Sequence, residues 1–142
     1  MKANELMIGD WVCYNVPNKY YTKVEEIRCT SDGEEYYIRC HRDSKDTYLE
    51  QLKHEDFSVD ILHPIPLTPE ILEKIGFEKW DDGWYIYDYE TTGIEIAWVG
   101  TILKISGEYV NLELPSVMYV HQLQHALRLC GIEIEIKLRD DY

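Results

Sequence analysis

A chain of 142 residues with 45% hydrophobic content can bury a substantial core, as one domain or two small ones, which excludes an intrinsically disordered protein. Its 27 acidic and 14 basic residues give a net charge of −13, which argues against direct binding to nucleic-acid phosphates. The apolar runs are far shorter than the roughly 18 residues that span a bilayer, and the first residues lack the apolar core of a signal peptide, so we expect a cytoplasmic protein that binds no membrane.

The N-terminal region, residues 1–63, has the rhythm of a small β-barrel. Its predicted strands lie at residues 11–14, 21–30, 35–41, 47–52 and 57–62. The second and third of these form a hairpin around Asp32-Gly33, which is a favoured type I′ turn pair. Short strands at this spacing predict an SH3-like barrel, although other small β folds share the same rhythm.

A proline-containing segment, His63-Pro64-Ile65-Pro66, separates this region from the rest of the chain. Two prolines at alternate positions impose an extended backbone and cannot join a central sheet ladder. We therefore predict two modules, a small β-barrel-like module at residues 1–63 and an α+β meander with two helices at residues 64–142.

The segment after this boundary gives the clearest local prediction in the chain. Thr68 can cap the start of a helix, and Pro69 fits its first position. Gly76 can take the left-handed conformation that ends the helix, with Phe77 reaching back toward Leu72. A helix of about two turns is marginal alone, so we expect it to dock on neighbouring structure.

The next part of the second module is predicted to be an antiparallel meander. Its strands are expected at residues 84–89, 94–99, 101–106 and 109–114. Ile94, Ile96 and Trp98 alternate with other residues along the second of these strands, which indicates one inner face. These residues should therefore face the core.

The end of the chain predicts one more helix and one more strand. The helix runs from about residue 118 to residue 130 and ends at Gly131. Strict alternation of apolar and charged residues over 132–138 predicts a strand beside the meander. The fold class predicted from all these elements is α+β, an SH3-like small β-barrel followed by an antiparallel meander packed with two helices.

Three segments of the sequence, Asn4–Asp10, Pro64–Phe77 and Tyr119–Gln124, carry a resemblance to other proteins. Together they resemble a family of small proteins of unknown function from gut Bacteroidetes and their prophages. The resemblance implies a cytoplasmic protein linked to mobile elements, and it implies no particular activity or binding site. The pattern of that family has Asn where this chain has His125, which argues against a metal role for His125.

The cysteines show no C-x-x-C spacing. They are Cys13, Cys29, Cys40 and Cys130. A disulfide scaffold would have denser, paired cysteines. We therefore interpret all four as reduced and mostly buried thiols.

One pair of histidines has the spacing of zinc-binding helices. His121 and His125 are four residues apart and share one helical face. However, Gln122 follows His121 where a metalloprotease helix carries its general-base Glu, and the sequence identifies no third ligand. We interpret the pair as half-exposed helix histidines and predict no metal site.

Adjacent carboxylates are frequent, but they do not form a pattern typical of catalysis. They occur as Glu25-Glu26, Glu34-Glu35, Asp81-Asp82 and Asp140-Asp141. Neighbouring residues on a strand point to opposite faces, so such pairs are poor acid–base dyads. The sequence also contains no Gly-rich phosphate loop and no nucleophile elbow. We therefore predict no catalytic residue and no cofactor, and we interpret the chain as a non-enzyme.

The aromatic content, with four Trp and twelve Tyr, indicates a candidate interaction surface. Tyr85, Tyr87 and Tyr89 share one face of a strand, while Tyr20 and Tyr37 belong to the first hairpin. One side of a sheet cannot bury all of these rings, and exposed Tyr is favoured at protein interfaces. The competing interpretation is that each Tyr completes the core with its hydroxyl in water.

These observations favour a non-enzymatic protein–protein interaction or accessory module linked to phage or mobile elements. Its partner would be an unknown protein or a second copy of the chain. One alternative is an acidic DNA mimic that inhibits a DNA-binding protein, although the acidic residues are spread out and mixed with Lys and Arg. The other alternative is an enzyme of unidentified type.

Overall fold

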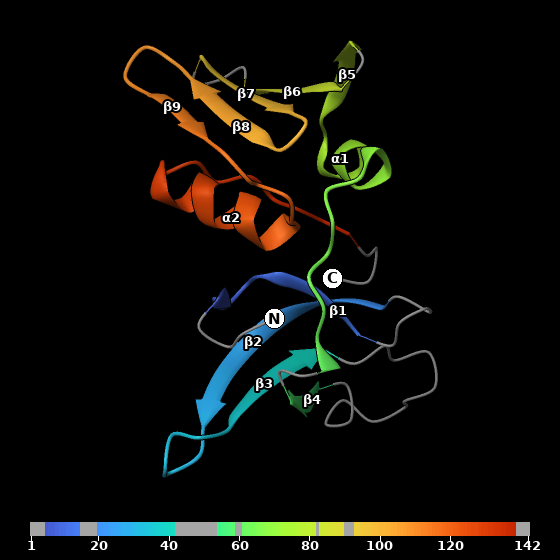
Figure 1. Cartoon of the computed structure of the whole chain (residues 1–142), viewed down its shortest axis with the longest axis vertical. Helices are drawn as coiled ribbons and strands as arrows, with labels where there is room; N and C mark the ends of the chain where they lie inside the picture. Colours follow the sequence, from blue (N-terminus) through green and yellow to red (C-terminus); the bar gives the residue numbers. More distant parts are fainter. Residues whose placement is uncertain are drawn as a thin grey trace. The chain divides into compact units, whose positions relative to one another are not determined.

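The computed structural model describes residues 5–14, 20–41, 54–58, 61–81, 83–89 and 93–138. The chain divides into two compact units, Met1–Ile65 and Pro66–Tyr142. The boundary predicted after His63 lies two residues before this division. The described strands form one antiparallel sheet in each unit (Figure 1).

The sheet of the first unit has four strands in the order β1-β2-β3-β4. These are β1 (Trp11–Tyr14), β2 (Tyr20–Cys29), β3 (Tyr36–His41) and β4 (His54–Ser58). The long strand β2 carries a register shift between Val24 and Glu26. Strand β1 pairs with the part of β2 before this shift, and β3 pairs mainly with the part after it.

The predicted α+β class is confirmed, whereas the SH3-like barrel is not. Among the described strands, β1 and β4 lie at the two ends of the order and do not pair with each other, so the sheet is open. The strand predicted at 47–52 lies outside the described residues, and in place of the one predicted at 57–62 the chain forms β4. Strand rhythm does not predict closure, because closure depends on strand stagger and tilt.

Asp10 fixes the beginning of β1 through its carboxylate and its backbone. Its Oδ2 accepts a hydrogen bond from Met7 N at 2.7 Å, and its carbonyl accepts one from Val24 N at 2.9 Å. The apolar core of the unit lies beside this strand and contains Leu6, Val12, Tyr14, Val24, Ile38, Cys40 and Leu62. Val12 and Tyr14 alternate along β1, and Ile38 and Cys40 along β3, so these residues share one face of the sheet. Trp11 and Cys13 on the other face of β1 are buried as well.

The hairpin between β2 and β3 forms where predicted, but the expected type I′ turn is wrong. That turn needs positive φ at both central residues, whereas Gly33 has φ 73° and Asp32 does not have positive φ. The chain instead reverses through a hydrogen bond from Gly33 N to Thr30 O at 2.8 Å. The Thr30 hydroxyl also donates to Asp32, and this hydrogen bond holds the pKa of that carboxyl below its usual value.

The second unit contains a five-stranded antiparallel sheet in the order β5-β6-β7-β8-β9. Its strands are β5 (Glu78–Asp81), β6 (Trp84–Tyr89), β7 (Ile94–Val99), β8 (Ile102–Ser106) and β9 (Asn111–Leu114). Strands β6 and β7 have the predicted bounds, and β8 and β9 begin slightly later than predicted. Strand β5 was not predicted.

One face of this sheet is buried. Tyr85 on β6 pairs with Trp98 on β7, which pairs with Leu103 on β8. Tyr85, Leu103 and Ile96 are all buried on this face, which confirms the predicted inner face of β7. The indole Nε1 of Trp98 donates to Val117 O at 2.8 Å, just before the second helix, which lies alongside the sheet in Figure 1.

Helix α1 (Pro69–Ile75) begins and ends at the predicted residues. The Thr68 hydroxyl accepts a hydrogen bond from Ile71 N at 3.3 Å. Gly76 is left-handed with φ 115°, and Phe77 N donates to Leu72 O at 2.9 Å. Both end signals act within a few residues, which explains why the prediction of this helix is confirmed.

Helix α2 (Val120–Leu129) is shorter than predicted but ends in the same way. Gly131 has φ 68°, and Ile132 N donates to Leu127 O at 2.9 Å. At the other end, Gln122 Oε1 accepts a hydrogen bond from Tyr119 N at 3.2 Å. Neither helix of the described residues has the length and apolar character needed to cross a membrane.

The predicted strand at residues 132–138 is wrong, because the segment does not belong to either sheet. Its side chains nevertheless alternate, with Ile132, Ile136 and Leu138 buried and Glu133 and Lys137 exposed. An extended chain that packs on a core from the side produces the same period of two as a strand. Periodicity therefore predicted the buried face and not the hydrogen-bonding partner.

Candidate interaction surface

The tyrosines of the predicted interaction surface differ in how far they are exposed. Tyr85 is only 5% exposed, and its ring lies 6.2 Å from that of Trp98 on the inner face of the sheet. Tyr87 is partly buried, with its ring centroid 5.6 Å from that of Phe77. The side chains of Tyr89 and Tyr20 lie outside the described residues, and Tyr37 is considered below.

Tyr37 is exposed at 40% and belongs to the first sheet. Its hydroxyl donates to the Glu35 carboxylate at 3.0 Å, and this hydrogen bond raises the pKa of Tyr37. Of the predicted tyrosines whose side chains the structure describes, Tyr37 alone is clearly exposed. The predicted row on β6 is therefore not an exposed aromatic patch.

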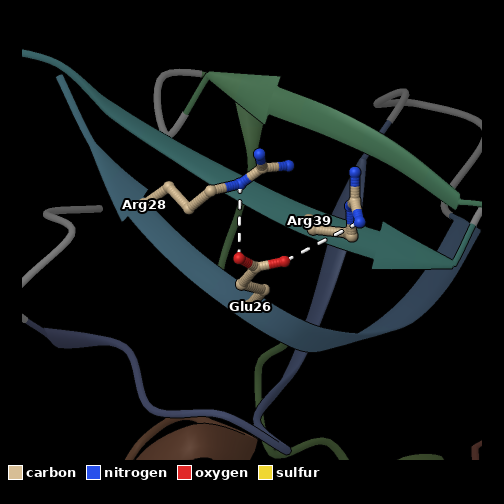
Figure 2. A network of polar contacts seen from close by, with 3 residues as sticks. All are labelled: Glu26, Arg28 and Arg39. Carbon is tan, nitrogen blue, oxygen red and sulfur yellow. Dashed lines mark ion pairs between the residues drawn. The ribbon is translucent and has the colours of Figure 1, made fainter.

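Where β2 pairs with β3, the face of the first sheet that carries Tyr37 is otherwise charged. Glu26 on β2 lies between Arg28 and Arg39, with oxygen–nitrogen distances of 3.5 Å and 3.7 Å (Figure 2). All three side chains are between two-fifths and one-half exposed. Ion pairs at such sites contribute about 0–1 kcal/mol. This face is therefore a solvated polar surface.

The outer face of the second sheet has a different composition. We call it the tryptophan face, and it consists of Trp80, Trp84, Ile86, Val99 and Ile102. Trp84 pairs with Val99 and Val99 with Ile102, so these three side chains form one row across β6, β7 and β8. Trp84 is 41% exposed, and Ile86, Val99 and Ile102 are each partly exposed. Partly exposed apolar side chains from adjacent strands thus form one continuous surface.

Trp80 extends this surface onto the edge strand β5. It is the extra residue of a β-bulge, because Lys79 pairs with Tyr85 while Asp81 pairs with Trp84. A bulge redirects the side chains around it, and Trp80 is 74% exposed. The sequence prediction missed both β5 and Trp80. The Asp-Gly pair before Trp84 is typical of a two-residue hairpin and could have indicated β5, but no sequence signal indicates the bulge that exposes Trp80.

Charged side chains surround the apolar row. Lys104 lies on the tryptophan face opposite Ala97 and Glu113, with its Nζ 5.8 Å from the ring centre of Trp84. Glu78 and Glu95 are exposed on the neighbouring strands β5 and β7. The centre of the face is therefore aromatic and aliphatic, while its surroundings are mainly acidic.

A hollow of about 660 Å³ opens at the side of this face, next to the end of α1. The residues that line it include Trp80, Ile86, Tyr87, Glu78, Lys79 and Glu95. Trp80 and Ile86 belong to both the hollow and the tryptophan face. The hollow is therefore a recessed continuation of the same surface.

The two helix histidines differ from the prediction in their exposure. His121 is buried and His125 is partly buried, so the pair is not half-exposed as predicted. The ring of His121 stacks on Tyr119 at 5.9 Å and meets His125 edge-on at 5.7 Å. Within the part of the chain that the structure describes, no group of three or more His, Cys, Asp or Glu side chains could hold a metal ion.

All four cysteines are thiols, and their burial is uneven. Cys13 and Cys40 are buried, Cys130 is partly buried and Cys29 is exposed.

Comparisons of the chain with protein-family models, with curated proteins and with solved structures find no match. The function is therefore inferred from the surface of the protein itself.

Proposed function

We propose that the protein is a cytoplasmic, non-enzymatic protein–protein interaction module whose contact surface is the tryptophan face. The observation that carries the proposal is the exposure of Trp80 and Trp84 on the outer face of an antiparallel sheet. Tryptophan is enriched among the residues that dominate binding energy at interfaces. The resemblance to prophage-linked proteins supports an accessory role in a mobile-element setting.

The two exposed indoles can supply a substantial part of the energy that binding requires. A buried aromatic side chain removes about 150–250 Å² from water, at about 25 cal/mol per Å². Covering the exposed parts of Trp80 and Trp84 would therefore yield on the order of 5 kcal/mol before the costs of association. Val99 and Ile102 would add to this gain. Association costs about 4–15 kcal/mol, so the two indoles alone do not hold a partner, and useful affinity requires a partner that covers the whole face.

The composition of the face supports this function over the two alternatives. A DNA mimic needs carboxylates along the centre of its contact surface, whereas Trp84, Val99 and Ile102 occupy this centre. A catalytic carboxylate needs a desolvated setting, whereas Glu78 and Glu95 beside the hollow are exposed. The face therefore supports binding better than mimicry or catalysis.

Site-specific photo-crosslinking in native host cells, with and without phage induction, tests the proposal. One variant carries the crosslinking residue at the tryptophan face, Trp84→benzoylphenylalanine. The matched control, Tyr109→benzoylphenylalanine, places the same group at a side chain that is 91% exposed and lies in the turn between β8 and β9. A third variant adds Trp80→Ala to the first.

We expect position 84 to capture a discrete protein, and we expect that position 109 does not capture the same protein. Trp80→Ala should reduce this crosslink strongly while leaving the fold intact, because the Trp80 side chain is mostly in solvent. The same captured proteins at both positions, or a crosslink at position 84 that does not depend on Trp80, would contradict the proposed surface.

A further inference from the structure

We infer that the hollow beside Trp80 receives an arginine side chain of the partner. The inference rests on the proposed function and adds the chemistry of the partner's contact residue. It depends on three features of the hollow, which are its carboxylates, the indole ring of Trp80 and its size. Each of these is set by the pairing of β5, β6 and β7.

The carboxylates come from the two strands that flank β6. Glu78 on β5 pairs directly with Ile86 on β6, and Ile86 pairs with Ala97 on β7. Glu95 lies two residues before Ala97 and therefore on the same face. Two exposed carboxylates thus stand on opposite sides of the apolar side chain of Ile86. A guanidinium group between them would find acceptors on both sides.

The indole ring of Trp80 supplies a second kind of attraction for a cation. Trp80 lines the hollow, and a guanidinium group stacks favourably on an indole ring. The ring of Tyr87 points to the opposite face of β6 and packs on Phe77, so it takes no part in this contact. The protein itself contains two contacts between an ammonium group and an indole ring. Lys104 lies over Trp84 at 5.8 Å, and Lys23 lies over Trp11 at 5.1 Å from the ring centre.

The charge of the surface selects a basic partner over a second copy of the chain. Lys79 also lines the hollow, but Glu78 and Glu95 outnumber it there. The whole chain carries a net charge of −13, so two copies would approach with strong mutual repulsion. A basic partner would instead be attracted to this face.

The size of the hollow fits one side chain with its flanking backbone. Ligand pockets usually have volumes of about 300–1,000 Å³, and this hollow has about 660 Å³. A long, planar arginine side chain can reach the carboxylates while its methylene stem contacts Ile86 and Trp80. The same contacts are not open to an acidic or a short neutral side chain.

The experiment is an NMR titration of the full chain with a small probe, the peptide acetyl-Gly-Arg-Gly-amide. The control peptide replaces arginine by citrulline, which has nearly the same shape and no charge. The indole N–H signal of Trp80 reports on the hollow, and that of Trp98 on the buried face serves as internal reference. The same titrations are repeated on Glu95→Gln and on Glu113→Gln.

We expect the arginine peptide to shift the Trp80 signal in a saturable manner and the citrulline peptide to shift it little. Glu95→Gln should weaken the arginine peptide about fivefold, the effect of removing one exposed charge partner. Glu113→Gln removes the same charge from the same face outside the hollow and should leave the affinity nearly unchanged. Equal binding of the two peptides, or equal losses in the two variants, would overturn the inference.

The outcome also separates this inference from the proposed function. If position 84 captures a partner while Trp80 does not respond to the arginine peptide, the proposed function stands and this inference fails. If Trp80 responds selectively to arginine while position 84 captures nothing, the hollow binds arginine, but the proposed function fails and with it the assignment of that arginine to a partner.

Discussion

The two sheets of this protein present outer faces that differ in kind. The first sheet exposes Glu26 between Arg28 and Arg39, and it exposes Tyr37, whose hydroxyl donates to Glu35. The second sheet presents Trp84 and the bulged Trp80 instead. Solvated ion pairs cost little to leave exposed, whereas exposed indoles forfeit the free energy of burial. The outer face of the second sheet therefore gains more free energy from being covered by a partner than that of the first sheet.

The inner and outer faces of the second sheet give the strongest test of this comparison. Tyr85 and Trp84 are neighbours on β6 and point to opposite faces. We expect Tyr85→Ala to lower the free energy of unfolding by about 3–5 kcal/mol, because it empties a buried site. Trp84→Ala should lower it by about 1 kcal/mol. Chemical denaturation of both variants measures the difference, and a larger loss at Trp84 would mean that the faces are assigned the wrong way round.

A smaller effect distinguishes two of the left-handed glycines, Gly76 at the end of α1 and Gly33 in the first hairpin. Gly76 has φ 115°, and an added Cβ would lie 2.9 Å from Cε2 of Tyr87. Gly33 in the first hairpin has φ 73° and open space around it. We expect Gly33→Ala to cost about 1 kcal/mol and Gly76→Ala about 2 kcal/mol. Denaturation curves that show equal costs would contradict the close contact between Gly76 and Tyr87.

The smallest effect concerns the pH dependence of the first hairpin. The hydrogen bond from Thr30 lowers the pKa of Asp32 in the folded protein. Because the pKa of Asp32 is lower in the folded than in the unfolded protein, the ionised carboxylate stabilises the turn at pH values above the unfolded-state pKa. This stability is lost as the pH falls through the folded-state pKa. In Thr30→Val, NMR titration should show the pKa of Asp32 moving back up. The pKa of Tyr37 should stay raised, because it depends on Glu35.

The sequence predicted those elements whose signals are local. Thr68 and Gly76 define both ends of α1, and each acts through hydrogen bonds within a few residues. Strands β6 and β7 were predicted with their observed bounds for a similar reason, because turn residues flank them.

The candidate site could not be predicted because it depends on strand register. Tyr89 on β6 pairs with Ile94 on β7, so four residues separate the two strands. With this register, the row of Tyr85 and Tyr87 lies on the same face as Trp98. A three-residue turn at Thr91-Thr92-Gly93 would have placed the same row on the opposite face, since a shift of one residue exchanges the two sides of a strand. The bulge that carries Trp80 is likewise a pairing feature with no periodic signature.

The exposure of the four tryptophan indoles tests the central claim most directly. Trp11 is fully buried and Trp98 donates its Nε1–H to Val117, whereas Trp80 and Trp84 are exposed. In an NMR spectrum recorded with a soluble paramagnetic agent, the indole signals of Trp80 and Trp84 should broaden and those of Trp11 and Trp98 should stay sharp. Protection of Trp80 and Trp84 would show that the tryptophan face is already covered, which would contradict its role as an open contact surface.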